Sequence, residues 1–191
     1  MQQATPNHIM IDLETMGTDD NAPILAIGAC EFNPATASIG SSIYLLASLE
    51  SNLALGRIPS ASTIYWWLKQ NQAAQGEIVK TEKATPLTDA LKNLKKWIHT
   101  RCENTNTYPV VWGNSAAFDI GKLNSAYRLL GVAPPWEFWD EQCYRTLKTV
   151  HNHIPFNRQG THHNALHDAE SQALHAAQIL HQHQLTIQKN K

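Results

Sequence analysis

The chain has 191 residues, of which 42% are hydrophobic and 16% are charged, and its formal net charge is −1. This composition is typical of a globular protein and excludes a disordered chain, while the length favours a single domain over residues 1–191. A net charge near zero also excludes a chain-wide electrostatic attraction to nucleic acid or anionic lipid. A polyanion would therefore need a local site, such as one built around metal ions.

Cysteine usage and the start of the chain indicate a cytoplasmic location. Cys30, Cys102 and Cys143 are odd in number, are widely spaced and form no C-x-x-C pair, so we expect free thiols in a reducing compartment. The first ten residues, MQQATPNHIM, have neither a basic region nor a long apolar region, so no signal peptide is expected. No apolar run reaches the roughly 18 residues that cross a bilayer, and we expect no membrane association.

Three strands are predicted in the first quarter of the chain. Residues 8–14 alternate, with Ile9, Ile11 and Leu13 on one face and Met10, Asp12 and Glu14 on the other. Two further strand-like runs follow over residues 23–32 and 39–49, with the turn sequence NPAT between them. The short connections predict a three-stranded antiparallel meander.

The rest of the chain alternates helices with one more strand. The predicted elements are a helix beginning near Ser60 or Ser62, a helix over 87–101, a buried strand over 108–113, a helix from about 117 that Gly131 ends, a short helix around 142–150, and a last helix from about 164 to 182. This order predicts an α/β fold with a mixed central β-sheet flanked by helices.

Two carboxylates stand two residues apart on the first predicted strand. Asp12 and Glu14 share a face, their Cα atoms about 6.5 Å apart, and Gly17 soon ends the strand. Burying such a pair costs several kcal/mol unless a cation compensates it. The alternative is a frayed strand end whose charges point into water, because D-x-E is a short and common pattern.

A second acidic motif follows the buried strand, in the sequence WGNSAAFDI. Asp119 falls in the first turn of the next helix, where it would also favour the helix dipole by less than about 1 kcal/mol. Asn114 and Ser115 can likewise be read as ordinary helix caps.

A third motif, HHNALHDAES, opens the last predicted helix. His163 precedes Asp168 by five residues, a spacing that lets a titratable base and a metal ligand reach one pocket. The alternative is a solvated polar helix start in a His-rich segment.

Together, D-x-E-T, N-x-x-x-F-D and H-x-x-x-x-D occur in an order that resembles the DEDDh, or DnaQ-like, 3′–5′ exonucleases of the RNase H-like superfamily. The resemblance runs from Ile9 to about Leu180 and includes the order of strands and helices. The sequences IDLETMGT, PILAIGACEF, STIYWWLKQ and PPWEFWDEQCYRTLK are similar to one branch of small stand-alone exonucleases of bacteria and their phages. The resemblance implies an RNase H-like fold and release of nucleoside 5′-monophosphates from single-stranded nucleic acid or short oligonucleotides.

The resemblance also assigns roles to the motif residues. Asp12, Glu14, Asp119 and Asp168 become the ligands of two Mg²⁺ or Mn²⁺ ions, and His163 becomes the general base. The spacing H-x-x-x-x-D selects His163 over its neighbours His162 and His167. His162 is expected to point away from it on an extended approach. Relatives often have a second glycine where this chain has the sequence NSA, at 114–116.

Candidate substrate contacts surround these motifs. At most one of the adjacent Trp66 and Trp67 is expected to face a groove, because neighbouring helical residues diverge by about 100°. The sequence does not decide which of the two faces the substrate, and Trp66 is included as the candidate. The full set of substrate candidates is Thr15, Met16, Gly17, Trp66, Asn114 and Phe118.

Two other functions compete with this interpretation. A catalytically retired binding module or partner subunit predicts the loss of at least one acid, and none is missing. A zinc site at His163 and His167 would need about four converging ligands. The sequence leaves open the choice between RNA and DNA, the preference for single or double strands, the biological pathway, and whether the chain forms a homodimer.

Overall fold

A five-stranded mixed sheet forms the centre of the computed structural model, which describes residues 5–79 and 81–189. The strands are β1 (Thr5–Thr15), β2 (Ile24–Asn33), β3 (Ser38–Leu46), β4 (Thr107–Gly113) and β5 (Glu141–Cys143). Their order across the sheet is β3-β2-β1-β4-β5. The first three pair antiparallel, and β4 and β5 add in parallel beyond β1. The predicted meander and mixed sheet are confirmed.

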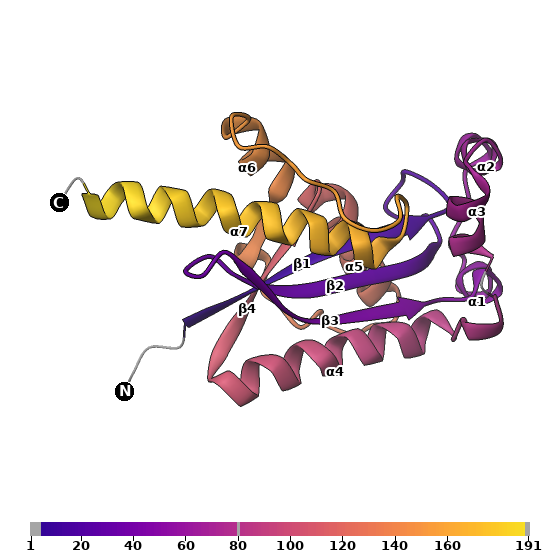
Figure 1. Cartoon of the computed structure of the whole chain (residues 1–191). Helices are drawn as coiled ribbons and strands as arrows, with labels where there is room; N and C mark the ends of the chain where they lie inside the picture. The colour runs from indigo at the N-terminus through magenta and orange to yellow at the C-terminus, as the bar shows by residue number, and fades with distance from the viewer. Residues whose placement is uncertain (1–4, 80, 190–191) are drawn as a thin grey trace.

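The alternation along β1 separates two apolar cores. Ile9, Ile11 and Leu13 pack with α4 (Leu87–Thr105) and α5 (Ala116–Leu129) on one face. Met10 packs on the other face with α7 (Ala165–Lys189), whose alanines lie close against the sheet. Figure 1 shows α7 and α4 on opposite sides of the strands. Asp12 and Glu14 follow Met10 at a period of two, so their side chains face the same layer, the one that contains α7.

Three short helices, α1 (Leu49–Ala54), α2 (Ala61–Leu68) and α3 (Gln72–Ile78), gather at the end of the sheet where β1 stops (Figure 1). Buried Arg57 donates hydrogen bonds to the Ala22 and Asp20 carbonyls, and Trp67 Nε1 donates to the Thr15 carbonyl at 3.0 Å. Buried carbonyls need a hydrogen-bond partner. Because Arg57 and Trp67 supply these partners, their bonds fix the position of the chain that leaves β1.

The structure corrects several predicted boundaries. The third strand ends at Leu46 and does not extend to Leu49, because the Ser48 hydroxyl caps a helix, α1, by accepting from Ser51 N at 3.2 Å. Residues 141–143 form the edge strand β5, so the following helix, α6 (Tyr144–Val150), begins two residues later than predicted. Neither α1 nor α3 was predicted.

Two predictions about the whole chain can be compared with the structure. Cys30, Cys102 and Cys143 are free thiols, as predicted. Within the described ranges, no helix combines the length and the apolar character needed to cross a membrane.

Candidate active site

The site begins where β1 extends past its parallel neighbour. β4 ends at Gly113, opposite Ile11, whereas β1 continues to Thr15. Asp12 and Glu14 therefore lie at the open end of the sheet, as the period-two pattern predicted. Glu14 is buried, and Asp12 is partly buried with its Oδ1 accepting from Gln172 Nε2 of α7 at 2.8 Å.

Asp119 reaches this end of the sheet from the first turn of α5. It is 2% exposed, and its backbone N donates to Ser115 O at 3.1 Å. Gly113 permits the approach, because a Cβ at that position would lie 3.0 Å from the Asp119 Cβ. Asp119 Oδ2 is buried, and no hydrogen bond reaches it from the described part of the chain. A carboxylate oxygen in this state is suited to a cation.

Asp168 comes from the first turn of α7, which packs closely on the sheet. Asn164 caps this helix through its Oδ1, which accepts from Leu166 N and His167 N, both at 3.1 Å. The turn lies directly on β2 at Gly28, where a Cβ would stand 2.2 Å from the Ala165 backbone. Glycine at that position thus lets the helix bring Asp168 to the carboxylates of β1.

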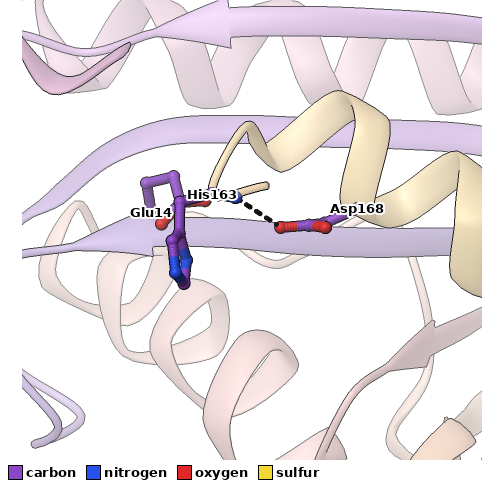
Figure 2. Close-up of side chains that lie close together, drawn as sticks. All are labelled: Glu14, His163 and Asp168. Atoms are coloured by element: carbon purple, nitrogen blue, oxygen red, sulfur yellow. Dashed lines mark hydrogen bonds between the residues drawn. The ribbon is translucent and has the colours of Figure 1, made fainter. Parts of the chain in front are cut away.

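His163 lies between the tryptophans of α2 and the acids. Its φ of 61° is left-handed, and its backbone N donates to Asp168 Oδ2 at 3.1 Å (Figure 2). The ring packs edge-on against Trp66, with 4.9 Å between centroids. One ring nitrogen, one Glu14 oxygen and one Asp168 oxygen lie within 4.8 Å of one another.

The two neighbouring histidines differ from His163. His167 Nδ1 accepts from Thr161 N at 3.1 Å and thereby stabilises the loop. The exposed His162 ring lies against His163 with 3.8 Å between centroids, so the prediction that it points elsewhere is wrong. The positive φ of His163 explains this, because it breaks the alternation of an extended chain.

Three further side chains take part in the site without having been predicted. Arg158, in the loop before α7, forms an ion pair with Asp168, and Gln172 orients Asp12. Glu77 of α3 accepts from Asn164 Nδ2 at 2.7 Å, and its charge acts on Glu14. Gln172 follows Asp168 by four residues on one helical face, a spacing that a sequence search can find. Arg158 and Glu77 lie in irregular or weakly patterned segments that carry no such signal.

The buried acids hold protons more tightly than ordinary carboxyls. Burial, then the charges of Asp119 and Glu77, raise the pKa of Glu14 to about 8. Burial raises the pKa of Asp119 to about 7, although the Asn114 backbone and the Lys122 cation oppose that rise. The pKa of Asp12 also lies well above its ordinary range through burial and the charges of Asp119 and Glu14. These shifts favour neutral acids unless a cation is present.

Burial, then the electrostatic effects of His162 and Arg158, lower the pKa of the His163 imidazole. A lowered pKa keeps the ring neutral at pH 7 and able to accept a proton.

A cavity of about 420 Å³ opens beside Glu14. Four substrate candidates line it: Thr15, Gly17, Trp66 and Phe118. Trp66 is 43% exposed, whereas Trp67 lines the cavity although it is only 3% exposed. The aromatic ring of Phe118 is held by Lys122, whose Nζ lies 3.4 Å from the ring centroid and donates to Thr18 O. The cavity thus combines apolar surface with one carboxylate of the acidic cluster.

The other two substrate candidates lie outside this cavity. Met16 lines a separate hollow with Leu46 and Glu77, and its backbone N and O are bonded to Pro23 O and Ser60 N. Asn114 lies on the β4–α5 turn, where its carbonyl accepts from Arg145 Nη2 at 2.9 Å. Its side-chain Oδ1 is buried and has no hydrogen-bond partner within the described segments.

A family model described as the Rv2179c-like 3′–5′ exoribonuclease domain matches residues 7–180. No sequence among the curated proteins matches the chain.

Several solved structures are similar in fold. The nuclease domain of 3′hExo, described as a DEDDh family member bound to rAMP, shares 15% identity and a TM-score of 0.63 over 92% of each chain. A 3′-exonuclease described as recognising the 3′ end of a histone mRNA stem-loop shares 13% identity and a TM-score of 0.62 over 95% of this chain and 84% of that chain. E. coli exonuclease I in complex with an oligonucleotide shares 14% identity and a TM-score of 0.57, and the match covers 96% of this chain and 44% of that chain. The predicted RNase H-like fold is confirmed.

Proposed function

Because the chain belongs to the family of Rv2179c-like 3′–5′ exoribonuclease domains, it is a 3′–5′ exonuclease, and we propose that it hydrolyses single-stranded nucleic acid with divalent metal ions. Within residues 1–191 we assign this activity to one exonuclease domain. RNA is the expected substrate, since the family is described by that activity. The products would be nucleoside 5′-monophosphates.

The observation that carries the proposal is the convergence of four acids and one histidine at the end of β1. Glu14 and Asp168 lie with His163 in one group. The charge of Asp119 raises the pKa of both Asp12 and Glu14, and the charge of Glu14 also raises the pKa of Asp12. A retired nuclease would have no reason to retain this costly cluster of buried carboxylates.

The donor set fits hard divalent cations. All four acids offer carboxylate oxygens, the ligands that Mg²⁺ and Mn²⁺ prefer, and Asp119 Oδ2 has no other partner among the described residues. When bound, two such ions would activate water, neutralise the phosphate and stabilise the leaving oxygen. Asp12, Glu14, Asp119 and Asp168 would hold the ions, and Glu14 and Asp168 would do so beside the His163 ring.

The chain's own residues would do the remaining work. A ring nitrogen of His163 would accept the proton of the attacking water, because its lowered pKa keeps it neutral and it lies beside Glu14 and Asp168. Trp66 and Phe118 would stack on the base of the terminal nucleotide in the cavity next to Glu14.

A strand labelled at its 5′ end tests the proposal. With Mg²⁺ or Mn²⁺ the label should remain on progressively shorter fragments, a 3′ label should leave at once as a mononucleotide, and EDTA should stop both reactions. Matched RNA and DNA strands, single and double, then measure the preference. Cutting of a circular single strand, or undiminished cleavage in EDTA, would contradict the proposal.

A further inference from the structure

Three cationic side chains gather beside the acidic cluster, although the chain as a whole has a net charge of −1. Arg145 and Lys148 are three residues apart on α6, and Arg158 lies in the loop that leads from α6 to α7. A spacing of three places the first two on neighbouring turns of one helical face. Figure 1 shows this loop running from α6 to the start of α7. Asp168 lies in the first turn of α7.

Two of the three cations contact the site directly. Arg145 Nη2 donates to the Asn114 carbonyl at 2.9 Å, on the turn that precedes Asp119, and its charge acts on that acid. Arg158 pairs with Asp168. Two of the cations therefore reach the acidic cluster, one from α6 and one from the loop before α7.

Lys148 lies within electrostatic reach of both arginines. Its Nζ is 5.3 Å from the centroid of the Tyr144 ring. Burial lowers the pKa of Lys148, and the charges of Arg145 and Arg158 lower it further, while none of the contributions comes from a carboxylate in the described chain. Like charges gathered in this way attract a polyanion.

Buried hydrogen bonds hold α6 in place against α7. The Tyr144 hydroxyl lies 2.7 Å from His175 Nδ1, and His175 Nε2 lies 3.0 Å from the Ile154 carbonyl. The helix that carries Arg145 and Lys148 is thus tied to the helix that carries Asp168. Cations positioned before a ligand arrives lose less entropy when they bind it.

We propose that Arg145, Lys148 and Arg158 form a phosphate strip that binds the backbone of the nucleic-acid substrate on the 5′ side of the scissile bond. The proposal rests on the exonuclease function and assigns it an extended binding surface. None of the three residues lines the cavity beside Glu14, which we assign to the 3′-terminal nucleotide. The strand that leaves the carboxylates must therefore pass over another surface, and the phosphate strip supplies complementary charge.

The double variant Arg145→Ala/Lys148→Ala tests the strip without altering Arg158, whose partner is a proposed metal ligand. Binding of a fluorescent single-stranded phosphorothioate decamer is measured by anisotropy between 50 and 200 mM salt. Each lost phosphate contact should reduce the log–log salt slope by about 0.7, so the double variant should lose about 1.4. Its affinity at 50 mM salt should fall roughly tenfold or more.

Two controls separate charge from structure. Arg145→Lys/Lys148→Arg keeps both charges and should restore the salt slope, and Lys92→Ala, on α4 across the sheet, should leave it unchanged. For wild-type and double-variant enzyme, kcat/KM is also compared on an unmodified phosphodiester decamer and an unmodified dinucleotide. The decamer value should fall with the affinity, and it should fall by more than the dinucleotide value, because a dinucleotide is too short to cover α6.

The outcomes distinguish the strip from the exonuclease function. A wild-type salt slope in the double variant, or an equal loss of kcat/KM on the dinucleotide, would overturn the phosphate strip. Failure of the wild-type protein to shorten the decamer would instead overturn the proposed function, while the salt slope would still report on the strip.

Discussion

Replacement of Glu14 by glutamine should stabilise the metal-free protein, and by more as the pH rises. Glu14 is 6% exposed, and burial raises its pKa from an ordinary 4.5 to about 8. A folded-state pKa above the unfolded value means that the folded protein binds the proton more tightly. The wild-type protein therefore loses stability as the pH rises from 4.5 to about 8, and glutamine removes that loss.

The size of the effect follows from the pKa. Each pH unit above 4.5 costs the wild-type protein about 1.4 kcal/mol, which reaches roughly 3 kcal/mol at pH 7. The neighbouring acids Asp12 and Asp119 share this repulsion, so the value is an upper bound for one substitution. In a chain of this length it corresponds to a midpoint increase of at most about 12 °C.

Thermal unfolding in EDTA between pH 5 and 8.5 measures the difference. The two proteins should be similar at pH 5, and the Glu14→Gln midpoint should exceed the wild-type midpoint increasingly toward pH 8. Excess Mn²⁺ should narrow or reverse the gap, because a ligand at 100 times its Kd adds about 2.7 kcal/mol to a protein with an intact site. Asp89→Asn, which removes the exposed partner of Lys92, should shift stability by less than about 0.5 kcal/mol. A Glu14→Gln protein less stable than wild type at pH 8 in EDTA would refute the reasoning.

Three further predictions test the arrangement of the site. His163→Ala should lower kcat by 10²–10⁴-fold and abolish the rise in rate with pH that lies below 6.5, whereas His167→Ala should stay within about tenfold of wild type; a crippled His167→Ala beside a normal His163→Ala would reverse the assignment. Trp66→Ala should raise KM by about tenfold or more, which corresponds to the free energy of stacking one base on an aromatic ring, and Trp66→Phe should recover most of the lost affinity. Equal KM values in the wild type and both variants would remove Trp66 from the substrate site. Gly28→Ala should lower both the unfolding midpoint and kcat, because the added Cβ collides with the Ala165 backbone and shifts the start of α7. An unchanged midpoint and an unchanged kcat would show that the close packing of α7 on Gly28 does not position Asp168.

Local patterns were sufficient to predict the elements that carry the acids. The period-two alternation of β1 placed Asp12 and Glu14 on one face, opposite the apolar Ile9 and Ile11, and the structure shows that arrangement. The helical stripes of α4 and α5 were equally visible, since apolar residues at a period of 3.6 need a partner surface. The predicted start of the last helix, near residue 164, placed Asp168 in the first turn of that helix, and α7 shows it there.

The missed features depend on contacts between distant parts of the chain. The strand β5 is only three residues long and exists because β4 offers it an edge, which a short segment such as Glu141–Cys143 does not reveal. The ring of His162 meets His163 because of one left-handed residue, and positive φ at a histidine has no sequence pattern. Arg158 approaches Asp168 through the path of the loop between α6 and α7.

The activity of an Asp12→Asn variant tests the central claim most directly, because Asp12 is a proposed metal ligand on which the charges of two others, Asp119 and Glu14, both act. Release of mononucleotides from a 3′-labelled single strand is followed for the variant and for the wild-type protein at saturating Mn²⁺, with circular dichroism and the unfolding midpoint measured in parallel. We predict a loss of at least about 10²-fold in rate in a protein that is folded and, without metal, at least as stable as wild type, since one buried charge is removed. A folded Asp12→Asn protein that releases mononucleotides at the wild-type rate would contradict the assignment of this acidic cluster as the catalytic centre.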